Sequence, residues 1–414
     1  MKTRYFIGLF ILFAGLQGCT PEKDVLIDFS EFQVTKIELA ADHRQLIADG
    51  VSTLTLNPVL YQSYTFRTEE GKDSVTYGKI PVDRITKEMV DYFLEDGTPL
   101  KDGKYQTTDL SKSEQGFYAM ANGVKSNIFK VAIRKPLAEN AYDTIVYPVV
   151  FHIIQNKMKV DVGQGVGSDI VYYAFNTIYN CFARTAAFSP NGADTRIRFR
   201  LAEYDPYGRK MAEKGINRYP LSADDLNALT LESIKADANI CWDYKKYLNI
   251  WIIDDLSSIA TTPQYILETT DLEQIKGIHF TPMALSDLES QDFSLTDIGL
   301  IYKAKDFAIE DVGYATQMGK FFGLLSTENQ REDYCDDTFA YSTYRDPWDK
   351  NSNASNSRKK ISTDGLIFYS VNIMDGSSYK NTISMDQVKR IRTVTDNCPH
   401  RWAWKSQWAF TGKE

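Results

Sequence analysis

The sequence predicts a multidomain protein in which an all-β sandwich is followed by an α/β domain with a mixed, twisted sheet. Short segments with alternating apolar residues occur at residues 34–40, 52–56 and 128–133, with glycine-containing turns nearby, a pattern typical of a β-sandwich. Residues 145–154 are nearly all apolar, as expected for a strand that is covered on both faces. Helical and strand-like segments then alternate, which indicates an α/β arrangement.

The elements of the second half can be placed in order along the chain. A helix is expected over residues 169–188, a strand over 197–202, a second helix over 224–238 and a further strand over 247–253. His152 lies inside the apolar run, and we expect it to be a core residue with one hydrogen bond.

The composition is that of a globular, acidic protein. The chain has 414 residues, of which 43% are hydrophobic and 25% charged, and its formal net charge is −8. This length is sufficient for two or three domains. The acidic balance, and the lack of a basic run with interleaved aromatic residues, argue against nucleic acid as a partner.

The N-terminus has the features of an export signal. Two basic residues precede an apolar run at residues 5–16, which is too short to span a bilayer comfortably. The run ends in L-Q-G-C, which resembles a bacterial lipobox with Cys19 as the lipidated residue. We therefore expect a signal peptide at 1–19, a tether at 20–31 and a lipid-anchored protein at the outer membrane or cell surface. An ordinary secretory signal is the alternative.

Four cysteines remain after Cys19, and an even number in an exported chain permits two disulfides in three possible connectivities. We predict that Cys335 pairs with Cys398 and that Cys181 pairs with Cys241. No C-x-x-C spacing is present, which argues against a cysteine zinc site.

The first folded unit is predicted over residues 32–135, and a linker continues from it to about residue 143. Within this unit, L-I-A-D-G-V-S-T-L-T-L at 46–56 and A-N-G-V-K-S-N at 121–127 resemble bacterial immunoglobulin-like domains of the invasin type. The resemblance implies a spacer or an adhesion module. Both roles stay open, because a fold alone does not give a function.

The second unit, predicted over residues 143–414, is organised around Y-A-T-Q-M-G-K-F-F-G-L-L-S at 314–326. Gly323 lies where a helix would end, because glycine accepts the left-handed backbone of many helix stops. The apolar residues before and after it recur at helical spacing: Ala315, Met318, Phe322 and Leu325.

Several further segments of this unit occur in a fixed order along the chain. They are Y-P-V-V-F-H-I-I-Q-N (147–156), I-R-F-R-L-A-E-Y-D-P-Y-G (197–208), G-I-N-R-Y (215–219), K-Y-L-N-I-W-I-I (246–253), D-Y-C-D-D-T (333–338), N-I-M-D (372–375) and a helical stretch at 385–393. Together they resemble the pappalysin-type metzincins, zinc proteases that include lipoproteins of Bacteroides-like bacteria. The resemblance implies an upper twisted sheet with helices, a cleft, an irregular lower part and a Met-turn at Met374.

The metzincin motif H-E-x-x-H-x-x-G-x-x-H places two histidines on one face of a helix, with a catalytic glutamate beside the first. The resemblance aligns its glycine with Gly323, but the ligand and catalytic positions hold other residues: Thr316, Gln317, Lys320 and Ser326. Hydroxyls are poor zinc ligands, and a lysine would place an ammonium where a dication should lie. We therefore expect that zinc, the cofactor implied by the resemblance, has been lost.

Other candidate ligands lie outside this motif. The four histidines are His43, His152, His279 and His400. The carboxylates of Glu328, Asp336 and Asp337 could hold a hard cation, although acidic loop clusters are usually solvated.

The sequence therefore predicts a lipid-anchored pseudoprotease that binds a peptide or protein in the former catalytic cleft. Two alternatives remain open. The chain could be an active metalloendopeptidase with a non-standard site, or an adhesion protein that acts through the immunoglobulin-like unit.

Overall fold

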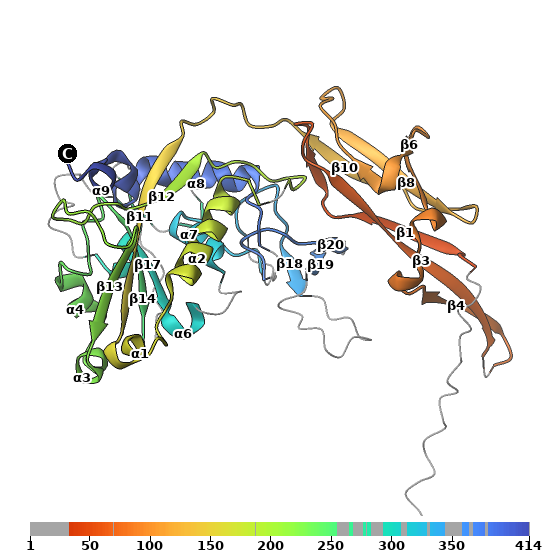
Figure 1. Cartoon of the computed structure of the whole chain (residues 1–414). Helices are drawn as coiled ribbons and strands as arrows, with labels where there is room; N and C mark the ends of the chain where they lie inside the picture. The colour runs from red at the N-terminus through yellow and green to blue at the C-terminus, as the bar shows by residue number, and fades with distance from the viewer. Residues whose placement is uncertain are drawn as a thin grey trace, which may run out of the picture.

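The computed structural model describes residues 33–68, 70–186, 188–254, 265–267, 276–278, 280–282, 293–307, 313–328, 332–343, 358–363, 367–376 and 380–413. They form two units that lie side by side (Figure 1). The predicted signal peptide and tether, with Cys19, lie outside the described residues, as does His279. None of the described helices is long and apolar enough to cross a membrane.

The first unit contains two sheets. In one, the strand order is β1 (Lys36–Ala41), β3 (Leu54–Arg67) and β4 (Asp73–Lys79), with β7 (Lys104–Tyr105) also paired to β3. In the other, the order is β2 (Gln45–Ile47), β10 (Phe129–Arg134), β8 (Glu114–Ala121), β5 (Asp91–Leu94) and β6 (Pro99–Leu100), with β9 (Val124–Lys125) paired to β8. Three short 3-10 helices connect strands: η1 (Val82–Arg84), η2 (Lys87–Met89) and η3 (Lys101–Gly103).

One apolar cluster joins the two sheets, because alternate residues of their strands point inward. It includes Leu39, Leu54, Phe117 and Val131, all 3% exposed or less. The strands expected near residues 34–40, 52–56 and 128–133 are present as β1, β3 and β10. The immunoglobulin-like assignment remains a prediction.

The second unit is centred on the long strand β11 (Ile145–Asn156). One edge of β11 pairs with β14 (Leu248–Ile253), which is followed by β17 (Gly299–Lys303). The other edge pairs with two strands in succession, first β12 (Ile197–Leu201) and then β13 (Ile216–Leu221).

All of these pairings are parallel, so within the described residues this sheet is parallel rather than mixed as expected. Two described strands between β14 and β17 form a separate pair, β15 (Tyr265–Leu267) and β16 (Phe280–Pro282), and do not add an antiparallel edge strand to the sheet. A small antiparallel sheet follows later in the chain: β18 (Tyr341–Thr343), β19 (Lys359–Ser362) and β20 (Ile367–Tyr369).

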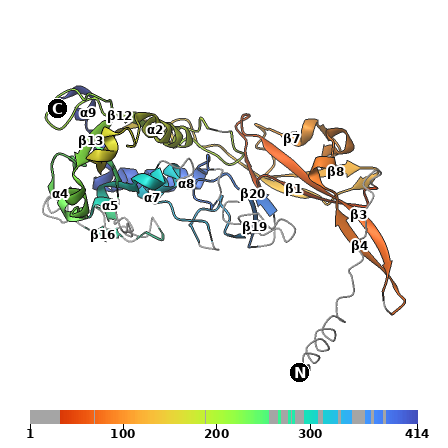
Figure 2. The same ribbon diagram turned by 60° about the horizontal axis from the view of Figure 1, so that its bottom comes forward.

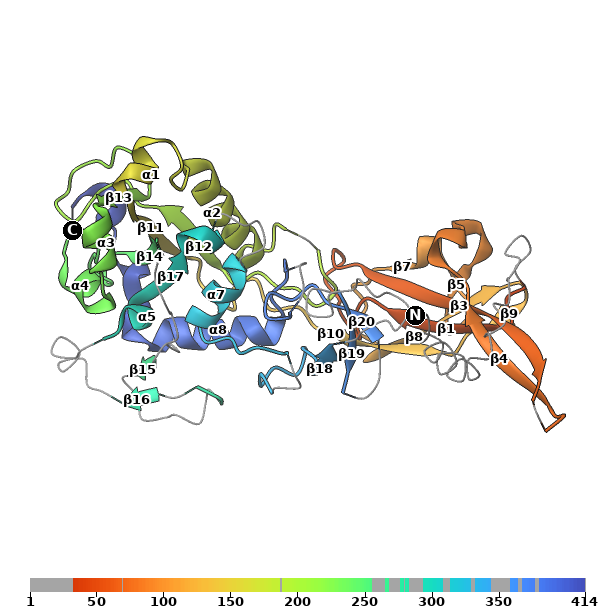
Figure 3. The same ribbon diagram turned by 90° about the horizontal axis from the view of Figure 1, so that it is seen from below.

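Helices cover both faces of the parallel sheet (Figure 3). One face packs against α2 (Ser168–Phe182), α7 (Tyr314–Phe321) and α8 (Met385–Asn397). The opposite face packs against α3 (Ala223–Asn227), α4 (Leu231–Ala236) and α5 (Leu295–Ile298). The single helix expected over 224–238 is therefore two short helices. The other helices in the described part of the chain are α1 (Lys157–Asp161), α6 (Ala304–Phe307), η6 (Pro399–Lys405) and α9 (Trp408–Thr411).

His152 is a core residue, as expected, but it has two hydrogen-bond partners where one was expected. Its side chain is fully buried in β11, where the ring stacks on Trp251 with centroids 5.9 Å apart. Its Nε2 lies 2.9 Å from Asn249 Oδ1, and Asn217 Nδ2 lies 3.0 Å from its Nδ1, so both ring nitrogens have partners. Burial lowers the pKa of His152 to about 4.

His400 is also buried, but among aromatic rings. It is 2% exposed, and its ring centroid lies 4.7 Å from that of Phe293 and 6.3 Å from that of Tyr244. Neither ring nitrogen has a hydrogen-bond partner among the described residues. Burial lowers the pKa of His400 to about 3.

The burial of these two histidines is expected to make the folded protein less stable in acid. Both folded-state pKa values lie below that of an exposed histidine, so the unfolded chain takes up protons first. The contribution of each neutral, buried histidine to the free energy of unfolding is fully present above about pH 6.5, and it is lost as the pH falls towards the folded pKa values. Each histidine should lower the free energy of unfolding by about 2–3 kcal/mol at pH 4.5 relative to pH 7. Urea denaturation at the two pH values measures the change, and His400→Leu should reduce it. An unchanged pH dependence in His400→Leu would contradict this account.

The two units are joined by ion pairs around one buried carboxylate. The Arg134 guanidinium lies 3.1 Å from Asp337 and 3.2 Å from Asp386. The Asp337 side chain is fully buried and also accepts hydrogen bonds from the Ser384 hydroxyl and the Asp386 backbone N–H. Burial, followed by the nearby Asp386 charge, raises the pKa of Asp337 to about 6. Asp337 is thus a structural anion and not a solvated loop carboxylate.

A second set of contacts joins the units next to β2. The Ile47 side chain is 2% exposed and belongs to the apolar core of the second unit. Its backbone N–H donates to the Pro190 carbonyl at 2.7 Å. Arg184 pairs with Asp49 at 2.8 Å. The first unit therefore contributes a side chain to the core of the second.

The predicted disulfides are wrong, because all four of these cysteines are free thiols. Cys181 lies in the core on the α2 side of the sheet, whereas Cys241 packs on the opposite face. Cys335 lies two residues before Asp337, whose carboxylate accepts a hydrogen bond from the N–H of Asp386 at the start of α8. Cys398 lies at the other end of this 13-residue helix. A helix of that length separates its ends by about 20 Å. Burial raises the pKa of all four thiols.

Candidate functional site

The helix expected around residues 314–326 is present as α7, and its end has a defined geometry. Gly313, in a left-handed conformation, precedes α7, and Gly323 follows it with φ +88°. The Gly323 N–H donates to the Lys320 carbonyl, and the Leu324 N–H donates to the Gly319 carbonyl, both at 2.9 Å. This pair of bonds is a Schellman motif, which satisfies carbonyls that the helix end would leave unbonded.

Gly323 also lies in close contact with neighbouring side chains. A Cβ at this position would be 2.7 Å from Val394 Cγ2 and 2.8 Å from Ile278 Cδ1. We expect Gly323→Ala to lower the free energy of unfolding by about 3 kcal/mol, because backbone strain adds to overpacking. Gly123→Ala is the matched control, since φ is +77° there but the Cβ would meet nothing within 4 Å. Its cost should be about 1 kcal/mol. Equal losses in urea denaturation would contradict the packing contribution.

Helix α7 packs directly on the bend at residues 372–376. Met374 is 2% exposed, and a Cβ on Gly319 would lie 3.0 Å from both Met374 Sδ and Ile373 Cδ1. The Thr316 hydroxyl donates to the Ile373 carbonyl at 2.5 Å, and the Thr327 hydroxyl oxygen lies 3.3 Å from the Met374 carbonyl oxygen. The methionine predicted at a Met-turn therefore lies beneath the helix predicted to carry the motif.

The bend is also fixed to the start of α8, the closing helix expected over 385–393. Asn372 and Gln387 exchange two amide hydrogen bonds, at 2.8 and 3.0 Å. Asn372 Oδ1 also accepts from the Met374 N–H at 2.9 Å. Ser384 caps α8 through a capping box with Gln387.

A buried polar network around Asp375, which sequence reasoning missed, supports the bend from below. The buried Asp375 carboxylate accepts hydrogen bonds from the Ser370 and Thr327 hydroxyls, and burial raises its pKa. Lys360 Nζ donates to the Gly376 carbonyl at 2.6 Å, and burial lowers the pKa of this lysine. These groups bond to one another and to the backbone, so the network stabilises the shape of the bend. No spacing in the sequence indicates it.

The positions aligned with the zinc motif have structural or surface roles. Thr316, at the first histidine position, is partly buried and bonds to the bend through its hydroxyl. Gln317 is partly buried, and Lys320 is exposed at the last turn of α7. Ser326 Oγ accepts a hydrogen bond from the Glu328 N–H at 3.2 Å. The motif positions therefore present two hydroxyls, an amide and an ammonium.

This donor set does not fit zinc, which prefers imidazole, thiolate and carboxylate ligands. In the part of the chain that the structure describes, no three His, Cys, Asp or Glu residues are grouped so that they could hold a metal ion. His152 is buried beside Trp251, His400 is buried beside Phe293, and His43 lies in the first unit, 6% exposed. Asp336 is exposed whereas Asp337 is buried against Arg134, so the two do not form a joint cation site.

Comparison with known proteins gives structural likenesses only. No model of a protein family matches the sequence, and no curated protein matches it significantly. Mature mirolysin from Tannerella forsythia, solved with a cleaved peptide, matches 65% of this chain and 97% of its own, with 19% identity and a TM-score of 0.41.

Two further solved structures give similar values. Mirolysin in complex with compound 9 matches 65% of this chain and 98% of its own, with 19% identity and a TM-score of 0.42. A promirolysin mutant from Tannerella forsythia matches 66% of this chain and 86% of its own, with 18% identity and a TM-score of 0.39. At these values the likeness assigns no activity, metal or ligand to this chain.

Proposed function

We propose that this chain is a lipoprotein, anchored through Cys19 at the outer membrane or cell surface, whose second unit is a pappalysin-like peptidase fold without peptidase activity. In this proposal it binds a peptide or protein beside α7, in the cleft that such a fold would carry. The ordered sequence segments and the packing of α7 on the Met374 bend support the kinship.

The contact between Thr316 and Ile373 carries the proposal of inactivity. At the first ligand position of the motif, a hydroxyl donates to the backbone of the bend, so this position fixes the helix. Lys320, one helical turn later, is exposed and cationic at neutral pH. Without a metal, both the Lewis acid and the activated water of this reaction class are missing.

Metal content and peptide cleavage test the inactivity. We expect substoichiometric zinc in the purified mature chain and no chelator-sensitive cleavage of unfolded, fluorescein-labelled casein. Stoichiometric zinc together with chelator-sensitive cleavage would establish the alternative of an active metalloendopeptidase with a non-standard site.

Binding of the same casein without cleavage tests the ligand part of the proposal. Lys320→Glu should change the affinity, because this side chain is exposed at the end of α7. Lys112→Glu, an equal charge reversal on the first unit, should leave the affinity unchanged. No binding, or equal effects of both variants, would overturn a ligand site beside α7.

The surface of the first unit favours adhesion as a second candidate function. Within the described residues, the outer part of the β3–β4 hairpin pairs only with itself, and it extends beyond β1 (Figure 2). It exposes Phe66, Val75 and Tyr77, which are 49%, 54% and 52% accessible. If Phe66→Ser combined with Tyr77→Ser abolishes casein binding while Lys320→Glu does not, the adhesion alternative is favoured. Point variants suit this test because Ile47 and Arg134 join the units.

A further inference from the structure

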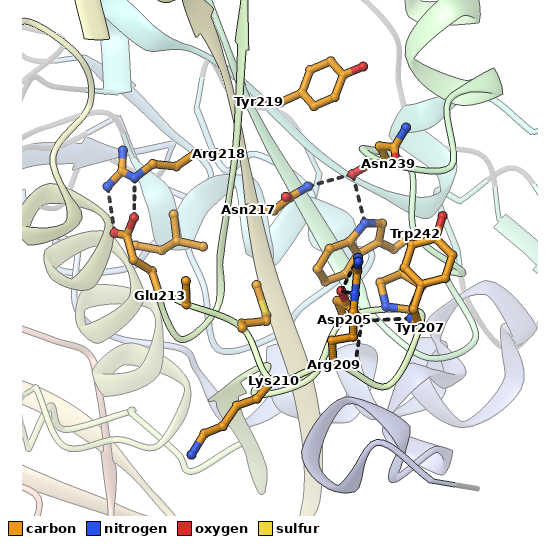
Figure 4. A pocket seen from close by; sticks show the side chains of 14 residues that line it. Asp205, Tyr207, Arg209, Lys210, Glu213, Asn217, Arg218, Tyr219, Asn239 and Trp242 are labelled. Atoms are coloured by element: carbon orange, nitrogen blue, oxygen red, sulfur yellow. Dashed lines mark hydrogen bonds and ion pairs between the residues drawn. The ribbon is translucent and has the colours of Figure 1, made fainter. Parts of the chain in front are cut away.

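A groove of about 560 Å³ lies at the edge of the parallel sheet that is opposite to α7 (Figure 4). It is formed by the loop at 205–213, the first residues of β13, and two side chains from the segment after α4, Asn239 and Trp242. β13 lies on one side of β11, and β17 lies at the end of the sheet on the other side. The Tyr302 hydroxyl of β17 donates a hydrogen bond to the Tyr314 carbonyl of α7. This groove is therefore separate from the site beside α7.

Backbone N–H and C=O groups of β13 point towards this groove. Among the described strands β13 forms a ladder with β11 alone, apart from an isolated bridge between Ile216 and Glu213. The Phe151 N–H donates to the Gly215 carbonyl at 2.8 Å. Because backbone groups alternate in a parallel ladder, residues 215, 217 and 219 face β11, and residues 216, 218 and 220 face outward.

Little of this outward edge is used within the chain. The Ile216 N–H donates to the Glu213 carbonyl at 3.1 Å, and Pro220 has no N–H to satisfy. The Ile216 carbonyl and both backbone groups of Arg218 remain, and among the described residues no backbone group bonds to them. Such an edge is what an extended peptide needs to add itself as a strand.

Side chains flank this edge on both sides, as Figure 4 shows. Arg218 and Glu213 form an ion pair at 2.5 Å on one side of the strand. Asn217, Asn239 and Trp242 lie on the other side, where the Asn239 carbonyl accepts from Asn217 Nδ2 and from Trp242 Nε1. The ring of Tyr207, 62% exposed, lies at the same groove and offers an apolar surface.

The charges of the groove do not balance. Arg209 pairs with Asp205 at 2.8 Å, and Arg218 pairs with Glu213. Lys210 is exposed and has no carboxylate partner among the described residues. One cation is thus in excess, in a chain whose net charge is −8. A carboxylate on the ligand would complement it.

We propose that the free edge of β13 binds an extended acidic peptide segment as an added strand. The main chain of the peptide pairs with Arg218 and the Ile216 carbonyl, an acidic side chain reaches Lys210, and an apolar side chain packs on Tyr207. The outward backbone groups favour a peptide over a small anion, which could use only the side chains.

Fluorescence anisotropy with the mature chain tests the proposal. The probe is a fluorescein-labelled peptide of sequence Glu-Val-Glu-Val-Glu, compared with its lysine counterpart and with a form that is N-methylated at alternate amides. We expect the acidic peptide to bind, and both other peptides to bind at least roughly tenfold more weakly, equivalent to about 1.4 kcal/mol. Lys210→Glu should weaken binding of the acidic peptide by a similar factor, because it reverses the unpaired charge.

A control variant separates this site from a general effect of charge. Lys112→Glu makes the same charge change on the first unit and should not alter the affinity of the acidic peptide. The site beside α7 is tested separately with casein and Lys320→Glu, so each proposal can fail while the other stands. Equal binding of the N-methylated peptide would show that strand addition is not involved, and no binding at about 1 mM peptide would overturn the site.

Discussion

Replacing Arg134 with alanine is expected to lower the free energy of unfolding by about 3–5 kcal/mol at pH 7.5. The substitution leaves the fully buried Asp337 carboxylate without its nearest cation, and it also removes the contact with Asp386. Urea denaturation followed by circular dichroism measures the loss.

The pH dependence of this loss identifies its cause. The folded-state pKa of Asp337 is raised to about 6, above its unfolded value, so its charge destabilises the fold at neutral pH and this cost falls as the pH drops through 6. Removing Arg134 raises that pKa further, because the guanidinium favours the charged form. The cost of Arg134→Ala should therefore be smaller at pH 5 than at pH 7.5.

A surface pair provides the matched control for this variant. Lys130 lies 3.7 Å from Glu114, with both side chains more than half exposed, so Lys130→Ala should cost under about 1 kcal/mol. Adding Asp337→Asn to Arg134→Ala should recover part of the loss, because no buried charge remains. A cost that is the same at both pH values, with no recovery, would refute the role given to Asp337.

Introducing the complete metzincin zinc motif is expected to make the chain bind zinc stoichiometrically. The variant carries Thr316→His, Gln317→Glu, Lys320→His and Ser326→His. Residues 316 and 320 are four apart in α7, so their side chains lie on one face. Zinc sites of structural type contribute apparent binding free energies of about 10–16 kcal/mol, which is far more than the loss of one hydroxyl contact. Elemental analysis after gel filtration measures the uptake, and the melting temperature should rise with zinc.

The same variant without Ser326→His is its control. It has only two of the three histidines, so it should take up less zinc after gel filtration. If the four-residue variant folds, as judged by circular dichroism, but binds no more zinc than the natural chain, the relationship to the metzincins would be untenable. This result would leave the proposal of peptide binding at the β13 edge unchanged.

The parts of the structure that local pattern determines could be predicted from the sequence. α7 follows from helical spacing and from Gly323, whose left-handed backbone ends the helix. α8 begins at a capping box, and β11 has the apolar run of a strand covered on both faces. In each case the signal and the structure lie within about a dozen residues of each other.

The contacts that connect distant segments could not be predicted. Arg134 and Asp386 are 252 residues apart, and nothing in either segment indicates the other. The disulfide prediction failed for the same reason, since an even count of cysteines says nothing about which face of a sheet each occupies. The free edge of β13 could not be predicted either, because it depends on the register in which β12 and β13 pair with the same side of β11.

The position of Ile47 has a consequence for how the molecule comes apart. Its side chain is part of the second unit's core while its strand belongs to the first unit's sheet. Neither unit can melt without exposing apolar surface on the other. Calorimetry should therefore record one heat-absorption peak for the whole chain, instead of the two that loosely tethered modules would produce.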